Sequence, residues 1–339
     1  MIRHFCTYFD HRYLSRGLAM YHSLSDHCPS ARLWVLCLSD ECYRVIAHLD
    51  SPRIIPIALE DFEREDDELR KAKTNRSPVE YYFTCTPSLP QWVLNHDPNV
   101  DLITYVDSDL YFFSDPEPIF QEMSDRSIAI IPHRFSPRLR WMERTGIYNV
   151  GWLSFRRDAD ALACLTWWRN RCIEWCYDLV EADRYADQKY LDQFPLLFRN
   201  LKIIEHKGAN LAAWNLRNYR LHERTGTLCV DDQPVVFYHF QGLRKIAPGV
   251  IDPGVRQYGL RVTWLMERKL FRPYMKKLKE AQHLIASSLN GTDPFAALHR
   301  SLILDDNKPP IQSRTRRVVT LLAAYFRLLT RHFLLSPSN

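Results

Sequence analysis

Hydrophobic and polar positions in the first hundred residues follow two alternating patterns. Short apolar runs are typical of strands, and the stretches between them carry apolar side chains at helical spacing. Asp40 is expected to cap the second helix, and Pro56 confines its strand to the edge or end of a sheet. The expected strands are residues 3–9, 32–38 and 53–57, and the expected helices are residues 13–24 and 40–49. This order predicts βαβ units and a parallel sheet covered on both faces.

The middle of the chain continues the pattern after a charged segment. Residues 60–78 are rich in Asp, Glu, Lys and Arg and are interpreted as a solvated helix and loop. A fully apolar run follows at 102–106, which is typical of a central, buried strand. Further strands are expected at 127–132, 149–155, 201–206 and 235–240, and a long helix at 158–180 with Asp158 near its start. The prediction is an α/β domain with a mixed, mostly parallel sheet flanked by helices.

Size and charge narrow the classes of protein. The chain has 339 residues, of which 46% are hydrophobic and 13% aromatic, so one large domain with an appendage can form. Lys and Arg exceed Asp and Glu by 45 − 40 = 5. A surplus this small gives no reason to expect a nucleic-acid partner.

Cysteine usage and the apolar runs indicate a cytoplasmic protein. The nine cysteines are odd in number, contain no C-x-x-C pair and lie partly inside apolar runs, so we expect reduced thiols in the core. The first residues, "MIRHFCTYFDHRY", lack the apolar core of a signal peptide. No run approaches the roughly 20 apolar residues of a membrane-spanning helix.

The character of the chain changes near residue 260. We expect one large α/β domain over residues 1–260 and a basic, helical C-terminal extension over 261–339. If residues 314–335 are helical, Val, Leu, Tyr and Phe fall on one face and Arg on the other. Such a helix lies either on an anionic membrane surface, which would make the protein peripheral at the inner face, or against its own domain. The pattern leaves both interpretations open.

Two carboxylates interrupt an apolar stretch in "LITYVDSDLYFF". Asp107 and Asp109 follow an expected central strand, and on a strand residues two apart point to the same face. The carboxyl ends of parallel strands are where ligands bind in open α/β sheets. Two like charges beside apolar sequence require a cation, and carboxylate oxygens suit Mg²⁺ or Mn²⁺. The alternative is a solvated turn.

A second cluster of polar residues follows the strand expected at 235–240. His239, Gly242 and Lys245 have the spacing H-x-x-G-x-x-K. A histidine nitrogen is a ligand for Mn²⁺, a glycine lets the backbone approach a phosphate, and a lysine supplies a positive charge to a diphosphate. We therefore predict that Asp107, Asp109 and His239 bind one divalent metal ion.

Five segments together resemble a known enzyme family. They are "TYFDHRYLSRGLAMYHSL", "YVDSDLYFF", "YNVGWLSF", "ADQKYLDQ" and "HFQGLRK". In this order they are similar to the metal-dependent, retaining glycosyltransferases of the glycogenin and bacterial lipopolysaccharide galactosyltransferase group, which have a GT-A (Rossmann-like) fold. The resemblance extends from residue 4 to about residue 250.

The resemblance implies roles for individual residues. Donor binding would involve Thr7, Asp10 and Tyr13 at the uridine, Asp107 and Ser108 in the metal motif, Gly151 beside the donor sugar, and Gly242 and Lys245 at the diphosphate. The catalytic set would be Asn149, Asp187 and Gln188, near the donor sugar and its anomeric carbon, and Trp214 and Asn215 would lie near the acceptor. The family usually has a Lys or Arg shortly before the metal strand, where this chain has Thr86, and its clamp often continues Lys-Pro-Trp, where this chain reads "KIAP".

The function expected from these residues is transfer of a sugar from a UDP-sugar to a saccharide or glycolipid acceptor, with Mn²⁺ or Mg²⁺ as cofactor. Gln188 is a poor nucleophile, so retention would proceed by attack on the front face of the sugar. One alternative is a Mg²⁺-dependent nucleotidyl- or phosphotransferase, which needs the acidic pair but not the "HFQGLRK" segment. The other is a degenerate, non-catalytic GT-A binding module, which the Thr86 departure favours.

Overall fold

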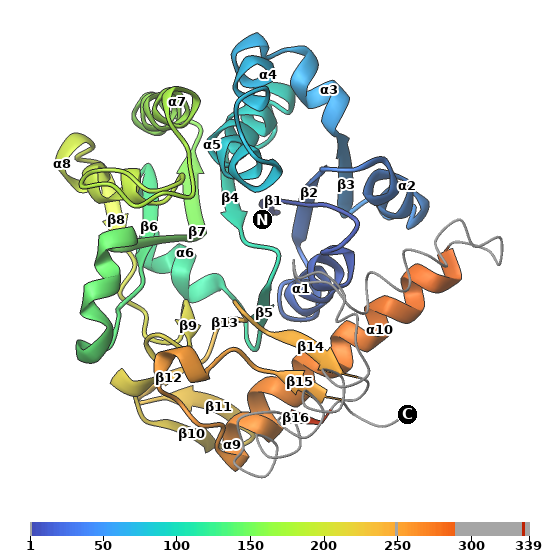
Figure 1. Ribbon diagram of the computed structural model, residues 1–339, viewed down its shortest axis with the longest axis vertical. Helices are drawn as coiled ribbons and strands as arrows, with labels where there is room; N and C mark the ends of the chain where they lie inside the picture. Colours follow the sequence, from blue (N-terminus) through green and yellow to red (C-terminus); the bar gives the residue numbers. More distant parts are fainter. Residues whose placement is uncertain (1, 248–249, 289–333, 336–339) are drawn as a thin grey trace, which may run out of the picture.

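A seven-stranded sheet forms the centre of the protein. The computed structural model describes residues 2–247, 250–288 and 334–335. The strand order of the sheet is β3-β2-β1-β4-β7-β6-β8 (Figure 1), and only β7 runs antiparallel to its neighbours β4 and β6. The predicted α/β class, a mostly parallel sheet flanked by helices as implied by the resemblance to GT-A transferases, is confirmed.

The elements follow the chain in alternation. The strands of the large sheet are β1 (Arg3–Phe9), β2 (Ala31–Cys37), β3 (Ile54–Ala58), β4 (Leu102–Val106), β6 (Ile128–Pro132), β7 (Tyr148–Arg156) and β8 (Leu201–Ile203). The α-helices are α1 (Leu14–His27), α2 (Asp40–His48), α3 (Leu59–Arg64), α4 (Asp67–Lys73), α5 (Pro78–His96), α6 (Glu117–Met123), α7 (Ala159–Glu174), α8 (Phe194–Leu197), α9 (Trp264–Met266) and α10 (Arg272–Ser288).

Helices cover both faces of the large sheet. Side chains from α1, α2, α6 and α10 pack on one face, where Phe5 and Trp152 are fully buried. The other face packs against α3, α4, α5 and α7, with Tyr105 and Phe155 in its core. Strands buried on both faces must be apolar throughout, which is why the 102–106 run contains no charged residue.

Three small sheets lie beyond the carboxyl edge of the large sheet. Their strands are β5 (Leu110–Phe112), β9 (Leu211–Ala212), β10 (Leu221–Arg224), β11 (Thr227–Val230), β12 (Gln233–Pro234), β13 (Phe237–His239), β14 (Arg244–Ala247), β15 (Val250–Asp252) and β16 (Leu334–Leu335). They form the lower part of the molecule in Figure 1, around a third core cluster that includes Trp214, Tyr238 and Phe271. Helix α10 runs from this part along α1, where Lys277 pairs with Asp26.

Several local predictions can be compared directly with the structure. Strand β1 has the predicted bounds, and Pro56 lies in β3 at the edge of the sheet, as predicted. The predicted cap of α2 is wrong, because Ser39 has the extended backbone of a cap and its hydroxyl accepts a hydrogen bond from the Cys42 amide. Asp40 is instead the first helical residue, where its negative charge interacts favourably with the positive end of the helix dipole.

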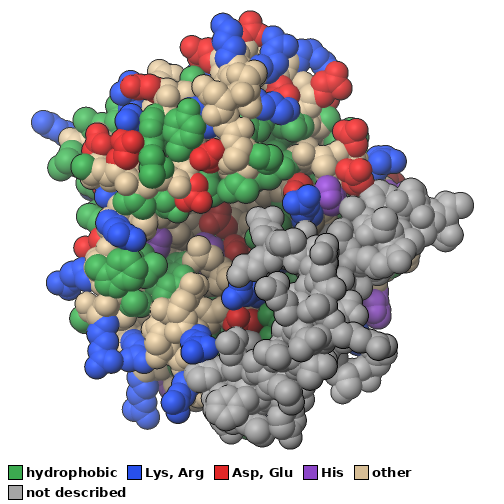
Figure 2. All heavy atoms as spheres, in the orientation of Figure 1, with side chains coloured by type: hydrophobic (Ala, Val, Ile, Leu, Met, Phe, Trp, Pro, Cys, Tyr) green, Lys and Arg blue, Asp and Glu red, His purple; other side chains and the backbone are tan. Residues whose placement is uncertain are grey.

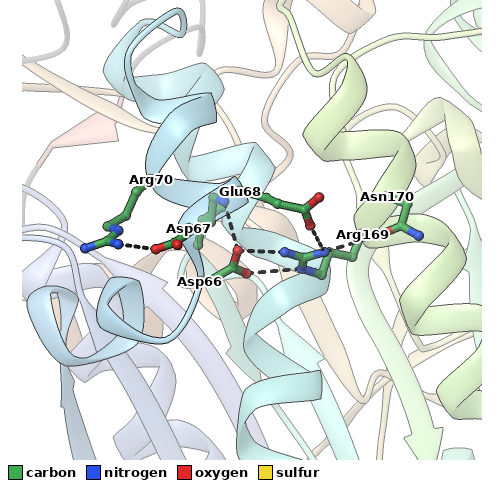
Figure 3. Close-up of polar contacts among 7 residues, drawn as sticks. Asp66, Asp67, Glu68, Arg70, Arg169 and Asn170 are labelled. Carbon is green, nitrogen blue, oxygen red and sulfur yellow. Dashed lines mark hydrogen bonds and ion pairs between the residues drawn. The ribbon is translucent and has the colours of Figure 1, made fainter.

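The charged segment 60–78 forms the short helices α3 and α4, tied to α7 by an ion pair (Figure 3). Asp66 caps α4 by accepting from the Leu69 amide, and both of its carboxylate oxygens accept from the Arg169 guanidinium at 2.6 and 3.1 Å. Glu68 also accepts from Arg169, at 3.0 Å. This part of the predicted solvated surface is therefore a half-buried contact between two helices.

The C-terminal expectations are only partly within the described residues. Helices α9 and α10, with a π-helical turn at Glu267–Phe271 between them, confirm that the extension begins as a helix. The predicted amphipathic helix at 314–335 lies outside the described residues apart from its last two, Leu334 and Leu335. These two pair with β15 as a strand, so the predicted helix does not reach residue 335.

All nine cysteines are buried and none forms a disulfide, as expected for core thiols. Among the described residues, no helix is long and apolar enough to cross a membrane.

Candidate functional site

The carboxyl edge of the large sheet gathers the polar residues of the candidate site. Strands β4 and β6 end there, which places Asp107 and His133 directly after their last residues. Strand β7 runs the opposite way and therefore begins at the same edge, with Asn149 as its second residue. The β6–β7 register shifts between Ile130 and Ile131, a bulge of the kind that often redirects side chains near functional sites. Seen from the front, acidic and histidine side chains lie recessed in a hollow near the middle of the molecule (Figure 2).

Asp107, Asp109 and His239 form a single cluster. One ligand atom from each lies within 4.8 Å of the other two. The His239 Nε2 atom is 3.0 Å from an Asp109 oxygen and 3.6 Å from an Asp107 oxygen. The two carboxylates do not share a strand face as predicted, because β4 ends at Val106 and the pair lies on the turn before β5.

Backbone pairing brings the third member of the cluster to the turn. Strands β13 and β5 are antiparallel with His239 opposite Leu110, and the Phe240 amide donates to the Asp109 carbonyl. Carboxylate oxygens suit both Mg²⁺ and Mn²⁺, and an imidazole nitrogen suits a borderline divalent ion such as Mn²⁺ better than Mg²⁺. The residues present therefore fit a divalent metal ion.

The charges of the cluster are mutually dependent. Burial raises the pKa of Asp107 to about 6, although His239 opposes the rise. Burial also favours a raised pKa for Asp109, but His239 and Arg16 together hold the pKa of this carboxyl below its ordinary value. Burial alone would lower the pKa of His239, and the two carboxylates raise it instead. The two carboxylates thus favour a proton on His239, and a metal ion bound by His239 would have to displace that proton.

Gly151 leaves room for the His239 ring. A Cβ atom at residue 151 would lie 3.1 Å from His239 Nδ1 and 2.5 Å from the Asn149 amide oxygen. The carbonyl of Gly151 accepts from the Asp107 amide at 3.3 Å. The Trp214 ring packs edge-on against the His239 ring, with 5.2 Å between the ring centroids. The His239 orientation is therefore fixed by packing.

The catalytic set expected from the resemblance is held by hydrogen bonds. The Gln188 amide oxygen accepts from Asn149 Nδ2 at 3.2 Å, and its nitrogen donates to the Thr145 carbonyl at 3.0 Å. Asn149 also contacts His133 Nε2 at 3.1 Å and accepts from the Gly151 amide. The Gln188 side chain is thus oriented before any substrate is present.

Thr86 contacts Asp187, the residue beside Gln188. The Thr86 hydroxyl lies 3.1 Å from the Tyr8 hydroxyl and hydrogen-bonds the Asp187 carboxyl. Burial raises the Asp187 pKa from 3.8 to about 7, with the Thr86 bond opposing this and Asp107 adding to it. Tyr105 completes the surroundings, because its hydroxyl donates to Asp107 at 3.0 Å. The glycosyltransferases that this chain resembles usually have a basic residue at the position of Thr86. In this chain the neutral Thr86 is instead the partner of Asp187, a carboxyl with a raised pKa.

Replacing Asp187 with Asn is expected to make the protein more stable than wild type above pH 7. A carboxyl with a raised pKa binds its proton more tightly in the folded state, so the free energy of unfolding falls as pH rises from about 4 to about 7. Asn removes this loss, so the stability difference should grow by about 2–4 kcal/mol across that interval. Urea unfolding in EDTA at pH 5 and pH 8 measures it. A difference that does not change with pH would contradict the assigned burial.

A cavity of about 560 Å³ adjoins the cluster. Its lining includes Tyr13 and Gly242, two of the residues expected to bind the donor, and Asp109, an expected metal ligand. Gly242 has a positive φ of 80° that favours glycine. Lys245 is exposed on β14 and is absent from the lining, whereas its neighbour Arg244 is present. Adjacent strand residues point to opposite faces, so the two basic side chains diverge.

The remaining predicted donor contacts lie around the same edge. Thr7 is buried on β1 and its hydroxyl has no hydrogen-bond partner among the described residues. Asp10 follows β1 and accepts from the Arg12 amide. Ser108 lies on the metal-ligand turn. Asn215 is fully buried and donates to the His133 carbonyl, which makes it a support of the site wall.

Sequence reasoning missed three residues of the site. His133 follows β6 as Asp107 follows β4, so the strand-end argument would have found it; burial lowers its pKa to about 3, which keeps it neutral. Ala186 has a positive φ of 45°, which strains the backbone just before Asp187, and no sequence signal marks it. Arg16 lines the cavity with Asp109 from a helix inside the resembling segment 7–24, but the resemblance implied no role for this residue.

Two proteins of Bacillus subtilis strain 168 are similar to this chain over most of its length. The uncharacterized protein YfnD is 31% identical over 284 residues, which cover 81% of this chain and 88% of YfnD. The uncharacterized protein YfnF is 32% identical over 253 residues, 72% of this chain and 82% of YfnF. No protein-family model matches the chain.

Several solved glycosyltransferases align with the structure. The galactosyltransferase LgtC, in complex with donor and acceptor sugar analogs, has a TM-score of 0.47 and 17% identity over 87% of this chain and 99% of LgtC. Mouse xyloside xylosyltransferase 1 has a TM-score of 0.45 and 12% identity over 71% of this chain and 98% of that protein. GlyE of Streptococcus pneumoniae TIGR4 has a TM-score of 0.47 and 11% identity over 91% of this chain and 66% of GlyE.

Proposed function

We propose that this chain, which belongs to the family of the Bacillus subtilis proteins YfnD and YfnF, is a metal-dependent glycosyltransferase that moves a sugar from a UDP-sugar to a saccharide or glycolipid acceptor. The observation that carries the proposal is the Asp107–Asp109–His239 cluster beside a large cavity. The motif order from residue 4 to about residue 250 supports the same reaction.

Different residues of the chain would act on the leaving diphosphate and on the transferred sugar. A divalent ion on the cluster, Mn²⁺ or Mg²⁺, would neutralise the charge that develops on the departing diphosphate. Gly242 lets the backbone approach the phosphates from the cavity wall, and Tyr13 lies on the same wall to contact the base. Lys245 lies on the adjoining strand and adds positive charge nearby.

Gln188 and Asp187 would act at the anomeric carbon. The Gln188 amide is fixed by Asn149 and Thr145, so its oxygen can face developing positive charge without reorganising. An amide is a poor nucleophile, which favours attack by the acceptor on the face that the diphosphate leaves, and therefore retention. Asp187 is buried beside it and supports the loop through Thr86.

Turnover of a panel of UDP-sugars tests the proposal. Purified protein with Mn²⁺ and each UDP-sugar is expected to release UDP, faster with added acceptor saccharides than with water alone, and EDTA should stop the release. Mass spectrometry of the acceptor would show the mass of one added sugar. Products that carry a phosphate or nucleotidyl group instead would assign the protein to the phosphotransferase class, and the absence of turnover with tight UDP binding would favour a binding module.

We also propose that the protein is cytoplasmic and that its C-terminal segment binds anionic membranes at the inner face. If the segment is helical, Arg327 and Arg331 fall on one face of it. Each basic residue near an anionic surface contributes about 1 kcal/mol, so the double variant Arg327→Glu, Arg331→Glu should lower binding at least roughly tenfold. Sedimentation with anionic vesicles at low salt measures this.

A matched control reverses two exposed arginines elsewhere, Arg138 and Arg140. Equal loss of sedimentation in both double variants would show only a general charge effect and contradict the assignment to the C-terminal segment.

A further inference from the structure

Three arginines line the cavity that adjoins the metal-ligand cluster. Arg16 comes from the first turn of α1, Arg244 from β14 and Arg256 from the turn after β15, whereas Asp109 contributes from the cluster. Arg16 is more than two hundred residues away from Arg244 and Arg256 in sequence. Only the fold brings the three positive charges to one cavity.

Arg16 is held in place by two contacts. Its Nη2 atom donates to the Leu243 carbonyl at 2.7 Å, and its guanidinium lies over the Tyr13 ring at 4.4 Å. The Leu243 carbonyl belongs to the turn that follows Gly242. Arg16 therefore connects Tyr13, the residue expected to contact the base, to the turn after Gly242, the glycine expected to approach the phosphates.

The charges of the cavity favour an anion. Arg244 is paired with Asp252 at 3.2 Å, so that pair is close to neutral. Among the remaining lining residues, the charged side chains are those of Arg16, Arg256 and Asp109, which together carry one net positive charge. A divalent ion on the cluster would add two further positive charges. A diphosphate, with several negative oxygens, matches this surplus, and a guanidinium offers several donors at once.

We propose that Arg16 binds the diphosphate of the donor directly, alongside the metal site. It would supply a cationic donor contact in a chain that has Thr86 where the glycosyltransferases it resembles have a basic residue. The inference rests on the proposed function for the identity of the donor, but diphosphate binding can be measured without it. Arg16 contacts the ligand from α1, and its bond to the Leu243 carbonyl keeps the guanidinium beside Gly242.

Two substitutions at Arg16 separate charge from anchoring. Arg16→Gln keeps an N–H donor for the Leu243 carbonyl and removes the charge, and Arg16→Lys keeps the charge. Calorimetry with Mn²⁺ alone, Mn²⁺ plus inorganic pyrophosphate, and Mn²⁺ plus UDP is the measurement. Arg16→Gln is expected to bind both diphosphates at least about tenfold more weakly, and Arg16→Lys about two- to threefold more weakly, with Mn²⁺ affinity lowered in neither.

Arg53→Gln is the control, because Arg53 also donates to a backbone carbonyl, that of Pro29, but lies on the surface away from the cavity. Wild-type diphosphate affinity in Arg16→Gln would overturn the inference. Equal losses in Arg16→Gln and Arg16→Lys, together with a lower melting temperature, would overturn it as well, because they would show an anchoring role alone. If the wild type binds Mn²⁺-pyrophosphate through Arg16 but turns over no UDP-sugar, the proposed function fails and the inference stands.

Discussion

Replacing Asp109 with Asn is expected to abolish metal-dependent UDP binding, with a loss of at least about 100-fold in affinity. Substitution of groups that only support metal ligands already costs roughly 10- to 100-fold. Asn has the shape of Asp and keeps an oxygen toward His239 Nε2, which lies 3.0 Å from the carboxylate in the wild type. What it removes is the charge that a divalent ion requires. Titration calorimetry with UDP, with and without Mn²⁺, measures the loss.

The control for this variant is Asp10→Asn, which changes a carboxylate at the same edge of the sheet but outside the cluster. Asp10→Asn should keep its dependence on Mn²⁺ even if its UDP affinity changes. Retention of Mn²⁺-dependent UDP binding by Asp109→Asn would remove Asp109 from the metal site. Circular dichroism of both variants excludes unfolding as the cause.

Replacing Gly151 with Ala is expected to reduce Mn²⁺ affinity at least about tenfold although residue 151 is not a ligand. The added Cβ would lie 2.5 Å from the Asn149 side chain and 3.1 Å from His239, so one or both must move. Overpacking of this kind costs about 1–3 kcal/mol of stability, and here the displaced groups are a proposed metal ligand and the partner of Gln188. Mn²⁺ titration and urea unfolding give the two effects separately.

Ser154→Ala on the same strand provides the comparison. Its hydroxyl is buried and lies 2.9 Å from the Thr104 hydroxyl, so the variant should lose about 1–2 kcal/mol of stability while leaving Mn²⁺ affinity unchanged. If Gly151→Ala bound Mn²⁺ like Ser154→Ala, the tight packing around His239 would not matter for the metal site.

The sheet and the clustering of Asp107, Asp109 and His239 were predictable because their signals are local. Residues 102–106 carry no charged side chain, residues 3–9 are mostly buried, and strands buried on both faces allow few alternatives. Asp107 and Asp109 directly follow such a strand, and His239 ends another. The rule that polar groups gather at the carboxyl edge then sufficed, although the two carboxylates lie on a turn and not on the strand itself.

The surroundings of these residues were not predictable, because long-range packing determines them. Thr86 was noted only as a departure from the family, and its contact with Asp187 joins segments about a hundred residues apart. The Arg16–Leu243 bond spans 227 positions. Side-chain direction on β14 was equally hidden: the motif marks Lys245, whereas the cavity is lined by Arg244. No periodicity in the sequence specifies such contacts.

Anomalous diffraction from crystals grown with Mn²⁺ and UDP tests the metal site most directly. We expect one manganese peak within roughly 2–2.5 Å of oxygens from Asp107 and Asp109 and of His239 Nε2. The diphosphate of UDP should complete its coordination and extend into the cavity that Gly242 lines. A manganese peak elsewhere, or UDP bound in that cavity with no metal at the three side chains, would contradict the proposed metal site.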